Sequence, residues 1–181
     1  ALQAGVARGV FSNESGLGSA PIAAAAAKTD SCVEQGLVCM TGTFFDTIII
    51  CTMTGLTLVI TGVWQGDVAG AAMTNLAFTQ GMGSQLGLYL VNIGLLFFAF
   101  TTIIGWNYYG ERCIVYLTNG VRHVMAYKIL YILCVAVAPY LSLRPIWYMA
   151  DITNACMAFP NLVALLVLSP VVVAETKKYF Q

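Results

Sequence analysis

Long stretches without charge are the feature that most constrains this chain. No Asp, Glu, Lys or Arg occurs in residues 47–66, 68–110, 129–143 or 152–174. A helix needs about 20 apolar residues to cross the hydrocarbon core of a bilayer, whereas a helix on a soluble core would carry a polar face. Because these stretches have no such face, the sequence predicts an all-α membrane protein.

The overall composition points in the same direction. Of the 181 residues, 59% are hydrophobic and 9% are charged, compared with about 25% charged in soluble domains. The net charge is zero, which gives no electrostatic basis for binding nucleic acid. The six cysteines show no CxxC pairing, and no Ser–His–Asp set, metal-ligand cluster or phosphate loop can be drawn, so we expect neither an enzyme nor a cofactor.

Five apolar segments are expected to form helices in a single transmembrane domain over residues 1–181. They cover about 1–27, 35–63, 86–109, 126–142 and 146–174, and an outside loop with a short helix covers 65–85. The sequence begins with Ala and without a signal-peptide pattern. We therefore interpret it as a fragment whose N-terminal half is missing.

The placement of Lys and Arg predicts an orientation. If the loops 28–34 and 111–128 share a side with the C-terminus, that side holds six basic residues and the other side holds at most Arg8 and Arg144. Basic residues gather on cytoplasmic loops. We therefore expect a cytoplasmic C-terminus and a last segment that crosses once.

The first segment is interrupted by the polar, glycine-rich run SNESGLGS over 12–19, which is poor in helix formers. Pro21 suits the first turn of a new helix, because its missing N–H would be unpaired there anyway, and Ser19 could cap that helix. We therefore expect a helix, an unwound stretch and a second helix.

An unwound stretch at membrane depth is tolerated where it lines a cavity or is buried in protein. Half-helix N-termini then offer partial positive charge to an anion, and unwound carbonyls offer oxygen ligands to a cation. Residues 11–19 fit this description. The alternative is an interfacial loop that joins two separate helices.

Several motifs carry a family resemblance. GVFSNESGLGSAPI over 9–22 follows Arg8, and further motifs are QGLV at 35–38, FDT at 45–47, CT at 51–52, FAFTTIIGW at 98–106, YYGE at 108–111, and Asp151 and Asn154 ahead of PNL at 160–162. Together they resemble the sodium:alanine (alanine or glycine:cation) symporter family, which usually has Ala where Ser15 stands. The resemblance spans essentially the whole chain and is weakest over 65–85.

The resemblance implies a leucine-transporter-type fold of two inverted five-helix repeats, with this chain as the second repeat and its first helix discontinuous. It also implies a secondary transporter in the plasma membrane that carries alanine or glycine inward, with sodium as the coupling ion. Two alternatives stay open. One is a proton-coupled transporter of another small amino acid, and the other is a membrane subunit that does not transport.

The resemblance places a substrate site at the break. Phe11, Ser12 and Asn13 are expected to line the pocket, and Gly16 and Gly18 let the backbone unwind and approach the ligand. For Asn13, the alternative is a packing amide.

A second group of site residues is implied further along the chain. Thr102 and Trp106 are four apart and share one helix face, and the matching family positions face the substrate. Thr101 and Thr102 hold hydroxyls where related transporters place sodium ligands. The alternatives are threonines that bond their own helix backbone and a Trp106 that belongs to an interfacial aromatic belt.

Two carboxyl groups lie in otherwise apolar segments, where ionisable residues are usually functional. Asp46 lies 12 residues past Glu34, about 18 Å along a helix and thus near mid-membrane. It could serve an ion route or hold helices together. Glu14 could pair with Arg8 or contribute to a cytoplasmic gate.

Overall fold

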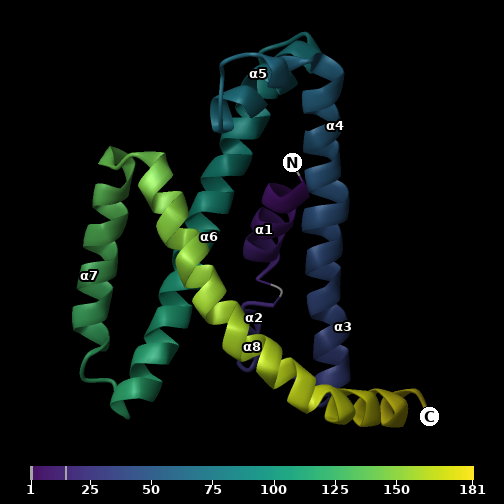
Figure 1. The fold of residues 1–181 in the computed structure, drawn as a ribbon, viewed down its shortest axis with the longest axis vertical. Coiled ribbons are helices and arrows are strands. Elements are labelled where there is room, and N and C mark those ends of the chain that lie inside the picture. Colours follow the sequence, from purple (N-terminus) through teal and green to yellow (C-terminus); the bar gives the residue numbers. More distant parts are fainter. Residues whose placement is uncertain (1, 15) are drawn as a thin grey trace. The chain divides into compact units, whose positions relative to one another are not determined.

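The computed structural model describes residues 2–14 and 16–181, and all regular structure in these residues is helical (Figure 1). The first half contains α1 (Leu2–Asn13), α2 (Ala20–Ala24), α3 (Cys32–Thr43), the π-helix η1 (Phe44–Cys51), α4 (Thr52–Thr61), the 3-10 turn η2 (Val63–Gln65) and α5 (Ala71–Met82). The second half contains α6 (Leu86–Thr118), α7 (Val124–Val137), the 3-10 turn η3 (Ala138–Tyr140) and α8 (Leu143–Phe180).

Three helical stretches among the described residues are long and apolar enough to cross a membrane. They are Cys32–Thr61, which joins α3, η1 and α4 end to end, and the long helices α6 and α8; Val124–Tyr140 is apolar but shorter. Of the most apolar part of each stretch, the chain itself buries 0% in Cys32–Thr61, 6% in α6 and 0% in α8. Soluble monomers do not expose apolar surface on this scale, so the chain is a membrane protein.

The break in the first segment begins after Asn13, where α1 ends, and α2 starts at Ala20 with Pro21 in its first turn, as predicted. The prediction that Ser19 caps α2 is wrong. Its side chain makes no capping hydrogen bond, because its backbone is already helical at φ −81° and ψ −40°. A capping hydroxyl normally reaches the first-turn N–H groups from an extended backbone.

The long helices run past the limits expected from hydropathy. α6 continues beyond residue 109 to Thr118, and α8 begins at Leu143 and passes through Pro160 and Pro170 to Phe180. Hydropathy marks where the chain leaves the apolar zone, whereas the backbone hydrogen-bond ladder continues as long as the residues tolerate a helix. The ends of the apolar segments therefore do not mark the ends of these helices.

The chain divides into two compact units. Unit 1 comprises Ala1–Gly42 and Asn107–Gln181, and unit 2 comprises Thr43–Trp106. In unit 1, α6 and α7 are in contact. A Cβ atom added to Gly110 would overlap the ring of Tyr127, and Lys128 forms a 2.8 Å ion pair with Glu111.

Unit 2 is held together at small residues. A Cβ atom on Gly87 of α6 would overlap the backbone of Phe78, and one on Gly81 of α5 would lie in ordinary contact, at 3.6 Å, with the methyl group of Thr61 of α4. The Nδ2 of Asn75 on α5 donates a 2.9 Å hydrogen bond to the Oδ1 of Asn92 on α6. Small residues and polar pairs are the usual contacts between membrane helices.

Candidate functional site

The predicted site residues fall into the two units. Phe11, Ser12, Asn13, Glu14 and Gly16 belong to unit 1, and Asp46, Thr101, Thr102 and Trp106 belong to unit 2. The residues of the break therefore belong to unit 1, and those of η1 and α6 belong to unit 2.

Glu14 opens the break with an unusual backbone. Its φ is +55°, a left-handed conformation that costs a non-glycine residue about 1–2 kcal/mol. Its N–H donates to the carbonyl of Phe11 at 3.3 Å, and its carbonyl accepts from the N–H of Leu17 at 3.4 Å. Its carboxylate accepts a hydrogen bond from the hydroxyl of Tyr109 on α6. Glu14 thus ends α1 and ties the break to α6.

Asn13 folds back on its own helix. Its Nδ2 donates a 2.9 Å hydrogen bond to the carbonyl of Gly9, which is the packing contact that was considered for this amide. Ser12 is exposed, and Phe11 is half-buried. These three side chains therefore sit in the last turn of α1, immediately before the backbone leaves the helix.

Gly18, near the end of the break, packs against α8. Leu17 is only 4% exposed, and a Cβ atom on Gly18 would lie 3.1 Å from the Oδ1 of Asn161. Gly18 has a φ of +80°, so both its conformation and its surroundings favour glycine. Asn161 follows Pro160, which has no N–H to donate to the preceding turn. Sequence reasoning noted Asn161 only as part of a motif and did not anticipate this contact.

A second link joins α1 to α8. The two guanidinium nitrogens of Arg8 donate to the two carboxylate oxygens of Asp151 at 2.6 and 3.3 Å, and Arg8 lies 4.0 Å from the ring centre of Trp147. Arg8 thus pairs with Asp151 rather than with Glu14, whose carboxylate is held by Tyr109. Ionisable residues in apolar helices are costly and need such partners.

In unit 2, Thr101 bonds its own helix. Its hydroxyl lies 2.9 Å from the carbonyl of Phe97 and 3.1 Å from that of Phe98, which is the alternative considered for this residue. A hydroxyl that donates in this way still has oxygen lone pairs that can accept. Thr102 is exposed, and Trp106 is half-buried on the same helix.

Asp46 lies in the first turn of the π-helix η1, where an α-helix was expected over 35–63. Short π-helical segments inside α-helices are rare and are frequent at functional sites. Nothing in the run FFDTIIIC distinguishes it from an ordinary apolar helix, so the sequence held no signal for this feature.

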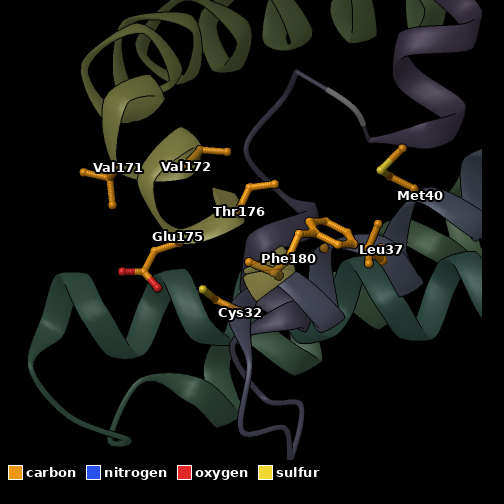
Figure 2. A pocket seen from close by; sticks show the side chains of 10 residues that line it. Cys32, Leu37, Met40, Val171, Val172, Glu175, Thr176 and Phe180 are labelled. Carbon is orange, nitrogen blue, oxygen red and sulfur yellow. The ribbon is translucent and has the colours of Figure 1, made fainter. Parts of the chain in front are cut away.

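A groove of about 440 Å³ lies within unit 1 between α3 and the end of α8 (Figure 2). Its walls are mostly apolar, with Leu37, Met40 and Phe180 on one side and Val172 on another, and Glu175 at its edge. None of the predicted site residues lines it. Its helical and mostly apolar walls offer few polar groups to the two charged ends of an amino acid, so this groove is a poor substrate site.

Comparison with known proteins also indicates a membrane transporter. The family model of the sodium:alanine symporter family matches residues 1–181. The chain is 62% identical to an uncharacterized transporter of Haemophilus influenzae, with 100% of the chain and 40% of that protein covered. No solved structure matches the chain.

Two further relatives have more specific names. The chain is 51% identical to the sodium/alanine symporter AgcS of Methanococcus maripaludis, with 99% of the chain and 40% of that protein covered. It is 36% identical to the probable sodium/glutamine symporter GlnT of Bacillus subtilis, with 99% of the chain and 37% of that protein covered. The chain thus spans about two fifths of the length of these relatives, and it belongs to the sodium:alanine symporter family.

Proposed function

We propose that this chain is the C-terminal part of a longer transporter, here called the parent transporter, which carries alanine or glycine across the plasma membrane together with sodium. The break between α1 and α2 is the observation that carries this proposal. A membrane protein that served only as a scaffold would have no need of an unwound polar stretch between two helices.

Phe11, Ser12 and Asn13 are the proposed substrate contacts of the break, and Gly16, at a φ of +91°, lets the backbone stay unwound beyond the end of α1. They stand in the last turn of α1 and just beyond it. Backbone groups freed at such a position can bind the charged ends of an amino acid. Thr102 and Trp106 are the proposed contacts from α6, with Trp106 limiting the size of the side chain.

Thr101 and Thr102 are the proposed sodium ligands. Hydroxyl and carbonyl oxygens suit a hard cation, and the Thr101 hydroxyl lies beside two backbone carbonyls of α6. Sodium and the amino acid are coupled when each favours the state that binds the other.

The proposed fold of the parent transporter has two inverted five-helix repeats, of which this chain is the second, with its C-terminus in the cytoplasm. The all-helical architecture and the broken first helix support this arrangement. The basic residues Lys177 and Lys178 in the last turn of α8 support the orientation.

A proton-driven transporter of another small amino acid is the second candidate. It is favoured by Glu14 and Asp46, which place one carboxyl group at the break and another in a π-helix. The name of the GlnT relative, a probable sodium/glutamine symporter, also motivates testing glutamine as a substrate.

The test is uptake of labelled alanine, glycine and glutamine by the parent transporter in proteoliposomes, under a sodium gradient or a proton gradient. Asn13→Ala and Trp106→Ala are expected to reduce sodium-driven uptake at least tenfold. Trp64→Ala is the matched control, because Trp64 is 56% exposed outside the proposed site. Uptake driven by protons alone would replace the sodium proposal with the second candidate, and no uptake under either gradient would contradict both.

A further inference from the structure

Glu14 combines a left-handed backbone conformation with a carboxylate that is hydrogen-bonded to Tyr109. Among the described residues, only Glu14 and Asn119 adopt a positive φ without being glycine, at 55° and 50°. Asn119 follows the end of α6, where asparagine is a common left-handed terminator. Glutamate has no such preference. A glycine or asparagine at position 14 would fit the backbone better, which indicates that the side chain of Glu14 has a role of its own.

The role of the Glu14 side chain is its hydrogen bond with Tyr109. The Tyr109 hydroxyl donates to its carboxylate, and a hydrogen bond to a charged group is worth more than one between neutral groups. Both residues belong to unit 1. The break is therefore attached to α6 at its first residue, while Gly18 contacts Asn161 of α8 further along.

The backbone of Glu14 determines where α1 ends. Its N–H bonds the carbonyl of Phe11, and its carbonyl accepts from Leu17, so both sides of the turn are tied to this one residue. The left-handed conformation sends the chain away from the helix axis directly after Ser12 and Asn13. The direction of the break and the placement of these proposed substrate contacts thus depend on Glu14.

We propose that Glu14 is a positioning residue for the substrate site, and that its hydrogen bond with Tyr109 fastens the break to α6. The effect of Glu14 on transport rests on the proposed function. The attachment of the break to α6 is a property of the fold and does not depend on that function. Glu14 acts through the backbone of residues 11–13 and does not itself contact the substrate.

The fastening is tested by hydrogen–deuterium exchange of the parent transporter in lipid nanodiscs, followed over residues 9–24. Tyr109→Phe removes the donor and is expected to speed exchange across the break about tenfold. Glu14→Asn keeps the left-handed backbone but cannot reach Tyr109, and should give the same increase. Glu14→Gln keeps a neutral acceptor and should give a smaller one. Tyr108→Phe is the matched control, because it removes a neighbouring hydroxyl but keeps the ring that lies under Arg112 and beside Tyr109.

The positioning role is tested by alanine uptake with the same variants. Tyr109→Phe should raise the alanine concentration for half-maximal uptake about tenfold and leave the maximal rate within about twofold, and Glu14→Gln, which keeps a neutral acceptor for Tyr109, should raise that concentration less. Exchange in Tyr109→Phe equal to that in Tyr108→Phe would overturn the fastening. Faster exchange with unchanged half-maximal concentration would overturn the positioning role. If the parent transporter takes up no amino acid, the proposed function fails and the exchange result still decides the fastening.

Discussion

The two units are held together by different kinds of contact. Unit 1 also has close glycine contacts at Gly18 and Gly110, but it adds charged side chains, with Arg8 bound to Asp151, Lys128 bound to Glu111, and the Glu14 carboxylate bound to Tyr109. Unit 2 uses glycine backbone, with Gly87 against Phe78, and one amide pair. Lipid removes most of the hydrophobic driving force between helices, so membrane helices need other contacts to stay together. The two units meet this need in different ways.

These solutions have different consequences for motion. A glycine contact holds two backbones at a fixed distance, and it can be lost only by separating the helices. An ion pair or hydrogen bond can break and form again with a new partner. Unit 1, which holds the break, thus contains contacts of the kind that can exchange.

The contrast is tested most severely by Gly87→Leu in unit 2. Its side chain would overlap the backbone of Phe78, and we expect a loss of about 3 kcal/mol in the free energy of unfolding, measured as a fall in Tm of the parent transporter in detergent. Gly94→Leu is the control, because a Cβ atom there meets nothing within 4 Å. Equal melting of the two variants would remove the case for backbone packing in unit 2.

The ion pair of unit 1 should matter somewhat less. Asp151→Ala leaves Arg8 without its bidentate acceptor, and because the two side chains are 38% and 46% exposed, we expect a loss of about 2 kcal/mol rather than the larger cost of a fully buried pair. The double variant Arg8→Ala/Asp151→Ala should recover part of this loss, since no charge is stranded. A double variant that simply adds the two single losses would show that the residues do not interact.

The amide pair of unit 2 should contribute less again. Asn92→Ala removes the acceptor of the 2.9 Å bond from Asn75, and hydrogen bonds between membrane helices are worth about 1 kcal/mol. A double-mutant cycle with Asn75→Ala, followed by thermal melting, measures the coupling. A coupling near zero would leave the glycines as the main contact of unit 2.

The smallest effect is expected for Lys128→Ala. The pair with Glu111 lies near the end of α6, where solvent and salt screen such contacts. The loss of Tm should shrink further as salt is raised from low to high concentration, whereas Arg122→Ala should show no salt dependence. A salt-independent loss would mean that Lys128 stabilises α7 by packing.

The helix class, the family and the start of α2 at Ala20, with Pro21 in its first turn, were predictable because each rests on local sequence. Apolar runs, a long motif and a proline are all readable within a few residues. The cap at Ser19 failed because its backbone conformation depends on the packing of the whole break.

The contacts of the site were not predictable in the same way. Arg8 was compared with Glu14, six residues away, whereas its partner Asp151 lies 143 residues away. The attachment of Glu14 to Tyr109 likewise joins distant parts of the chain. Sequence shows that a charge in an apolar helix needs a partner, but only the tertiary fold selects that partner.

The π-helix η1 gives the stretch Cys32–Thr61 a property that a uniform helix lacks. Each α-helical residue turns the chain by 100°. Because a π-helical turn holds more residues, the rows of side chains along one face of α3 are offset from those along α4. Asp46 stands at this offset. Residues spaced by one turn in α3 therefore do not continue the same stripe in α4, so no single stripe of side chains runs the whole length from Cys32 to Thr61.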